Sequence, residues 1–159
     1  MDLQLDGRRA LVTGGTRGIG RAVVEAFADE GVAVAFCARD AVEIASTERA
    51  LTGRAGTAAG SVVDVADALA LARWVADSAE HLGGLDIVVS NVSALAIPDS
   101  EENWQASFEI DLMGAVRLVT AAMPHLLNSD AAVILAISSV SGREIDFAVG
   151  PYGTMKAAL

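Results

Sequence analysis

The chain has 159 residues, of which 53% are hydrophobic and 20% charged, a balance typical of a globular domain and unlike that of a disordered chain. Its formal net charge of −10 argues against nucleic acid or an anionic membrane surface as the main partner, and its two histidines and one cysteine exclude an internal disulfide and a convincing zinc site. No apolar run reaches the roughly 18 residues of a membrane span, and the amino terminus lacks a secretory apolar region, so we expect a cytoplasmic protein.

The sequence alternates short apolar runs with helical patterns. The runs that we expect to form buried parallel strands are residues 8–14, 32–38, 57–63, 86–90 and 131–137. The stretches that we expect to be helical are residues 18–30, 40–52, 67–82 and a long one near 101–128. Asp40 is placed to cap the start of its helix, and Gly31, Gly53 and the pair Gly83–Gly84 stand where helices end. Five strands joined through helices predict one α/β domain over residues 1–159, built on a doubly wound parallel sheet.

The last part of the long helix is unusually apolar. Between Leu112 and Leu127 only Arg117, Thr120 and His125 are clearly polar. A helix that is apolar on all sides is buried on all sides. In a chain of this size its outer side needs a partner, so we expect a homo-oligomer, dimer or tetramer, with this helix at the subunit contact.

A glycine-rich loop joins the first expected strand to the first expected helix. Its sequence, TGGTRGIG, has the spacing T-G-x-x-x-G-x-G, because Val23 stands where the third glycine of G-x-G-x-x-G would be. Glycines allow the backbone to approach a pyrophosphate, which the helix amino terminus attracts. A tight loop without a ligand is the alternative, but the position between a buried strand and a helix favours dinucleotide binding. The loop residues that we expect to contact the cofactor are Gly14, Thr16, Arg17, Gly18, Ile19 and Gly20.

The charges near this loop favour NADP(H) over NAD(H). An acid at the end of the second strand would bind the 2′-hydroxyl of NAD, but Ala38 stands there and Arg39 follows. Arg17 and Arg39 suit a 2′-phosphate, which accepts paired N–H bonds. Alternatively both arginines are solvated surface residues, or Asp40 is the missing acid, although Asp40 fits better as a helix cap.

The sequence GPYGTMKAAL at positions 150–159 places Tyr152 and Lys156 one turn apart on one helix face. An ammonium at that distance favours the phenolate, which makes the tyrosine a better acid or base near neutral pH. Ser139 follows the fifth expected strand, at the sheet edge where ligands bind in such folds. Its hydroxyl there can hydrogen-bond a substrate oxygen and hold it beside Tyr152.

These motifs resemble the short-chain dehydrogenase/reductase family along the whole chain. The resemblance rests on the glycine loop, Asp64, Asn91, Ser139 and the pair of Tyr152 and Lys156. It implies a Rossmann-like three-layer α/β/α fold in which Tyr152 is the general acid/base, Ser139 orients the carbonyl and Lys156 binds the nicotinamide ribose. It also implies that Asp64, with Val65 beside it, contacts the adenine, and that Asn91 lies on the cofactor's adenosine side.

Two residues depart from the family pattern. Ser93 replaces a glycine of the usual N-N-A-G motif, and Asp111 replaces an asparagine that usually holds a water of the proton relay. An ionised Asp111 can accept a hydrogen bond from water but cannot donate one, and its charge partly opposes a phenolate. The resemblance therefore predicts that Asp111→Asn leaves activity equal or improved.

The family continues beyond the Tyr–Lys helix with further strands and a substrate loop, so we expect a sheet that is incomplete at its carboxyl-terminal edge. We accordingly expect residues from Gly142 onward to be poorly ordered or held by another subunit, with Tyr152 and Lys156 away from catalytic geometry. The function that the sequence favours is an NADP(H)-dependent oxidoreductase acting on a carbonyl or alcohol. A cofactor-binding or oligomerisation fragment without turnover is the alternative.

Overall fold

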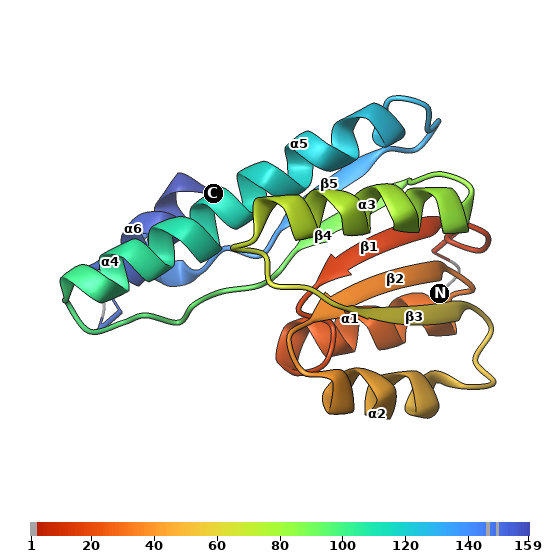
Figure 1. The fold of residues 1–159 in the computed structure, drawn as a ribbon, viewed down its shortest axis with the longest axis horizontal. Helices are drawn as coiled ribbons and strands as arrows, with labels where there is room; N and C mark the ends of the chain where they lie inside the picture. The colour runs from red at the N-terminus through yellow and green to blue at the C-terminus, as the bar shows by residue number, and fades with distance from the viewer. Residues whose placement is uncertain (1–2, 146, 149) are drawn as a thin grey trace.

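The computed structural model describes residues 3–145, 147–148 and 150–159, which contain a parallel sheet with helices on both faces (Figure 1). Its strands are β1 (Arg9–Thr13), β2 (Ala33–Ala38), β3 (Thr57–Val62), β4 (Ile87–Ser90) and β5 (Val133–Ala136). They lie in the order β3-β2-β1-β4-β5, so the chain extends the sheet first to one side of β1 and then to the other. This confirms the predicted doubly wound α/β fold.

The helices form two layers because alternate residues of each strand face opposite sides of the sheet. On one face α1 (Gly18–Asp29) and α2 (Ala41–Leu51) pack over Val12 and Phe36, and on the other α3 (Ala68–Leu82) and α5 (Gly114–Leu126) pack over Leu11 and Val88 (Figure 1). The neighbours Leu11 and Val12 thus belong to separate cores. Each is fully buried, which fixes the register of the central strand.

The predicted helix ends are confirmed. The Asp40 carboxylate accepts hydrogen bonds from the backbone N–H groups of Val42 and Glu43, which satisfies two unpaired donors of α2. Gly83 ends α3 in the left-handed conformation, at a φ of 74°. The lone cysteine, Cys37, is buried, and burial raises the pKa of its thiol to about 12.

The long helix is confirmed as one continuous element with an irregular middle. It comprises α4 (Glu101–Ser107), a π-helical segment (Phe108–Met113) and α5. Within α5, Leu118, Ala122 and Leu126 are buried against the sheet, whereas Val116 and the residue that follows the helix, Leu127, are exposed. The helix is therefore not buried on all sides within the described chain, and whether a second subunit covers its outer side stays a prediction.

The two outer strands correct the expectation of uniformly buried strands. All four residues of β5 are exposed, with Ile134 at 41% and Leu135 at 46%, and Val62 of β3 is 62% exposed. Each outer strand has a single paired neighbour within the described sheet. Apolar sequence alone does not separate such a strand from a central one, because both have the same pattern of side chains.

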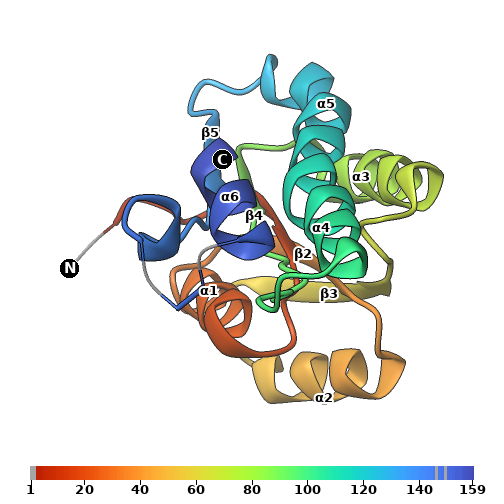
Figure 2. The same cartoon turned by 90° about the vertical axis from the view of Figure 1, so that its left-hand side faces the viewer.

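The expectation of a poorly ordered tail is wrong for the described residues. The helix α6 (Pro151–Ala158) is formed and packs against α4 and the π-helical segment (Figure 2). Gly142 permits this packing, since a Cβ there would lie 2.7 Å from the Lys156 carbonyl carbon. The Ser138 hydroxyl also donates to the Lys156 carbonyl oxygen at 2.6 Å. Asp146 and Val149 belong to the expected tail but lie outside the described residues.

Candidate active site

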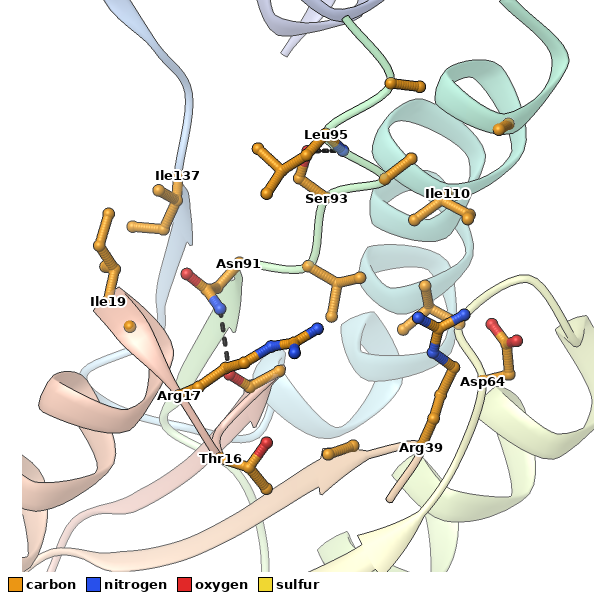
Figure 3. Close-up of a pocket in the computed structure, with 18 of the residues that line it drawn as sticks. Thr16, Arg17, Ile19, Arg39, Asp64, Asn91, Ser93, Leu95, Ile110 and Ile137 are labelled. Atoms are coloured by element: carbon orange, nitrogen blue, oxygen red, sulfur yellow. Dashed lines mark hydrogen bonds between the residues drawn. The ribbon is translucent and has the colours of Figure 1, made fainter. Parts of the chain in front are cut away.

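A cleft of about 1130 Å³ opens at the carboxyl ends of β1, β2 and β4, next to the point where the strand order reverses. Its walls come from the glycine loop, the ends of β2 and β3, the segments after β4 and β5, the π-helical segment and α6. Figure 3 shows part of this lining. Ligands of open α/β sheets bind at this place, because the loops diverge there and leave a crevice.

The backbone of the glycine loop is held by hydrogen bonds to residues at the ends of two neighbouring strands. The Cys37 carbonyl at the end of β2 accepts hydrogen bonds from the N–H groups of Gly14 and Gly15, at 2.8 and 3.1 Å. The Asn91 side chain, after β4, donates to the carbonyls of Thr13 and Gly14, at 3.0 and 3.3 Å. The hydroxyl of Thr13, the first residue of the loop, also accepts from the Asn91 N–H at 3.0 Å.

The same loop leaves room and donors for a phosphate. Gly14 and Gly18 have φ values of 72° and 56°, which side chains disfavour, and a Cβ at Gly20 would collide with the Gly14 carbonyl oxygen. Arg17 occupies the N-cap position of α1 but makes no side-chain capping bond. The first N–H groups of α1 therefore remain available to an anion, which the helix dipole also favours.

The expected cofactor-contacting residues lie around one part of the cleft. Figure 3 shows the exposed side chains of Arg17 and Arg39 extending into the same space from the start of α1 and the end of β2. Asp64 is exposed on the opposite side from α1, and its carboxylate accepts a hydrogen bond from the Ala66 N–H at 3.0 Å. The predicted residues found on the cleft wall are Gly14, Thr16, Arg17, Gly18, Ile19, Arg39, Asp64, Val65 and Asn91.

The other end of the cleft brings together three of the four expected catalytic residues. Tyr152 and Lys156 line the cleft, and the Lys156 ammonium lies 5.9 Å from the centroid of the Tyr152 ring. The same ammonium donates to the Ile137 carbonyl at 2.9 Å and lies 3.4 Å from Asp111 Oδ1. Asp111 Oδ2 accepts from the Ala94 N–H at 3.1 Å. Lys156 and Asp111 are 4% and 1% exposed, so this is a buried pair of opposite charges.

Ser139 is not among the described residues that line the cleft. Its hydroxyl oxygen instead accepts from the Ser141 N–H at 3.2 Å and caps the 3-10 turn Val140–Gly142. The neighbouring Ser138 lines the cleft, and its hydroxyl donates a hydrogen bond to the backbone carbonyl oxygen of Lys156. Sequence reasoning missed Ser138, because two adjacent serines at a strand end face different sides and the sequence does not say which.

Neither a metal-binding cluster nor a membrane-crossing helix is found in the described part of the chain. There, no group of three or more histidine, cysteine, aspartate or glutamate residues is arranged to hold a metal ion. Among the helices of the same residues, none has the length and apolar character needed to cross a membrane.

The comparisons with known proteins agree with this geometry. The family model described as short chain dehydrogenase matches residues 8–159. The chain belongs to the short-chain dehydrogenase/reductase family. Among curated relatives, the isoepoxydon dehydrogenase of Penicillium expansum is 41% identical over 160 residues, which cover 97% of this chain and 61% of that protein. An uncharacterized oxidoreductase of Bacillus subtilis is 32% identical, over 100% of this chain and 61% of its own length.

Solved structures of the short-chain dehydrogenase family superpose closely. A short chain dehydrogenase of Burkholderia cenocepacia in complex with NADP has a TM-score of 0.90 at 29% identity, covering 97% of this chain and 64% of that one. The carveol dehydrogenase of Mycobacterium avium in complex with NAD has a TM-score of 0.88 at 27% identity, covering 96% and 61%. The chain therefore spans roughly three fifths of the length of the relatives it matches.

Proposed function

We propose that this chain forms the cofactor-binding and proton-transferring part of an NADP(H)-dependent oxidoreductase that interconverts a small-molecule carbonyl and the matching alcohol. The observation that carries the proposal is the meeting of two motifs in one cleft. Tyr152 and Lys156, on α6, line the same space as the glycine loop after β1. The names of solved relatives, one in complex with NADP and one with NAD, support a dinucleotide as the cofactor.

The residues present fit such a cofactor. The start of α1 has no side-chain cap, so its N–H groups can donate to a pyrophosphate. Gly20 lies so close to the Gly14 carbonyl that no side chain fits at this position, which lets the backbone approach the pyrophosphate. Asp64 and Asn91 also line the cleft, and in this proposal they contact the adenosine that extends from the pyrophosphate. When bound, NADP(H) supplies or accepts the hydride at the substrate carbon.

The proton step belongs to Tyr152. Its hydroxyl would donate a proton to the carbonyl oxygen during reduction and take it back during oxidation. The positive charge of Lys156 near the ring offsets the negative charge that Tyr152 acquires as the proton leaves. Asp111 acts on this step through Lys156, since it contacts the ammonium and not the ring, and is therefore a positioning residue.

NADP(H) is preferred to NAD(H) in this proposal because of two guanidinium groups. Arg17 and Arg39 both reach the cleft, and no hydrogen bond or ion pair to the described protein residues occupies either side chain. Free guanidinium groups bind a 2′-phosphate through charge-assisted paired bonds.

A cofactor-binding module without turnover is the second candidate. The orientation of Ser139 favours it, since the hydroxyl expected to hold the substrate is used in a local turn. Two measurements separate the candidates: titration of NADPH by fluorescence, and steady-state reduction of carbonyl compounds. Binding with turnover supports the oxidoreductase, binding without turnover supports the module, and the absence of NADPH binding contradicts both.

A homo-oligomer and a cytoplasmic location complete the proposal. The exposed apolar side chains Phe108, Val116, Met123 and Leu127 follow the outer side of the long helix, where water contact is unfavourable. A second copy of the chain is the proposed partner of this surface. A single cysteine, buried and unpaired, fits a reducing compartment such as the cytoplasm.

A further inference from the structure

A carboxylate lies directly against the glycine loop, in the cleft that Arg17 and Arg39 also line. The Thr16 hydroxyl donates a 2.8 Å hydrogen bond to Glu43 Oε2, and both residues line the cleft. Glu43 comes from the first turn of α2, so it approaches the loop from a different element than the acid that usually selects NAD.

Glu43 differs from the other two acids of this region in how its charge is used. The Asp40 carboxylate accepts two backbone N–H groups at the start of α2, and Asp64 accepts the Ala66 N–H. Both are thereby turned toward their own backbone. Glu43 instead accepts a neutral hydroxyl of the glycine loop, which holds the carboxylate at the cleft and leaves its negative charge uncompensated by any recorded ion pair among the described residues.

We infer that Glu43 limits the selectivity of this site for the 2′-phosphorylated cofactor, acting against Arg17 and Arg39. The inference rests on the proposed nucleotide site. A 2′-phosphate carries nearly two negative charges, and Arg17, Arg39 and Glu43 line the same cleft, so a phosphate bound by the two guanidinium groups would be repelled by the Glu43 carboxylate. NAD(H) lacks this phosphate and shares only the pyrophosphate charge with NADP(H), so its binding is affected less by the same carboxylate.

The charge of Glu43 can be separated from its structural role. Glu43→Gln keeps an oxygen that accepts from Thr16 and removes only the charge. Glu48→Gln is the matched control: it makes the same charge change on α2, but Glu48 accepts from the Gly60 N–H and is not among the described residues of the cleft wall. Glu43→Ala is a second variant. Its ratio of NADPH affinity to NADH affinity can be measured even if both affinities fall.

The test measures the dissociation constants of NADPH and NADH for the wild-type chain and these variants, at about 0.1 M and about 1 M salt. Glu43→Gln is expected to bind NADPH about fivefold more tightly at the lower salt concentration, with NADH changed by less than about twofold. The difference should shrink at high salt, and Glu48→Gln should leave the ratio unchanged.

Four outcomes overturn the inference. Equal changes for both cofactors in Glu43→Gln would mean that Glu43 acts only on the shape of the loop. The same change of ratio in Glu48→Gln would mean that only the net charge of the protein matters. Failure of the wild-type chain to bind either cofactor would overturn the proposed function together with this inference, whereas binding of both with an unchanged ratio in every variant overturns the inference alone.

Discussion

Lys156 and Asp111 form a buried pair, with 3.4 Å between the ammonium nitrogen and Oδ1. The pair joins α6 to the π-helical segment, and the other Asp111 oxygen binds the Ala94 N–H after β4. Both partners of this carboxylate are hydrogen-bond donors. The amide of an asparagine would have to turn its own donor toward one of these two donors. The geometry therefore argues against the expectation that Asp111→Asn leaves the activity equal or improved.

We therefore predict that Asp111→Asn lowers the free energy of unfolding by about 1–3 kcal/mol, because the buried Lys156 charge loses its counter-charge. Urea denaturation of Asp111→Asn, Lys156→Met and the double variant measures the coupling between the two residues. We expect a coupling energy of about 1–3 kcal/mol. Strictly additive effects of the two single variants would mean that the pair contributes nothing.

Tyr152→Phe should remove carbonyl reduction, with a loss of at least about 100-fold in turnover, because the ring is kept and the transferable proton is lost. NADPH affinity, measured by fluorescence titration, should stay within about twofold of wild type, since the glycine loop is untouched. Residual turnover near the wild-type rate would show that another group moves the proton.

Arg39→Asp and Arg17→Ala should each weaken NADPH binding by about 1–3 kcal/mol, as expected for lost charge-assisted bonds to a phosphate. NADH binding should change much less. Arg49→Ala serves as the control, because Arg49 is an exposed arginine on α2 outside the set of described cleft residues. Calorimetric titration with both cofactors gives the comparison, and equal losses for NADPH and NADH would assign the arginines to folding.

Asp86 should make the chain sensitive to acid. This carboxylate is 1% exposed, and both of its oxygens accept hydrogen bonds from the Arg9 side chain. It also accepts from the Arg9 backbone N–H and from the Ser129 hydroxyl. The hydrogen bond from the Arg9 side chain is the main cause that holds the pKa of Asp86 well below its usual range. Because the folded-state pKa is depressed, the stabilisation is present at neutral pH and is lost as the pH falls below about 4.

The corresponding variant is Asp86→Asn, which leaves the Arg9 charge without its partner. At pH 7 we expect the free energy of unfolding to fall by about 3–5 kcal/mol relative to wild type. Denaturation curves recorded at successively lower pH should show this difference narrowing below about pH 4. A difference that is constant with pH would exclude an ionised Asp86 as its origin.

The outer side of the long helix should mediate self-association. Val116→Glu or Leu127→Glu, at exposed apolar positions, should shift the chain toward the monomer because each places a charge in the proposed contact. Light scattering at micromolar concentration measures the shift. Wild-type chain that is already a monodisperse monomer would contradict the proposed contact.

The sequence by itself determined the element order, the helix caps and the glycine loop. These features depend on neighbouring residues: Asp40 caps α2 through groups two and three residues away, and the spacing from Gly14 to Gly20 shapes one turn. The hydrophobic periodicity is equally local, which is why the doubly wound sheet follows from it. The position of the cleft then follows from the topology, since parallel strands all end at one edge.

Only the tertiary structure decided how distant segments meet. The exposure of β5, the packing of α6 and the contact of Asp111 with Lys156 all depend on how elements far apart in the chain pack together. Which group a side chain contacts depends on the space between packed elements and on the donors and acceptors within reach. The identity of the residue alone determines neither of these. For that reason the sequence placed Tyr152 and Lys156 on one helix face, but the fold decided that this face closes the cleft of the glycine loop.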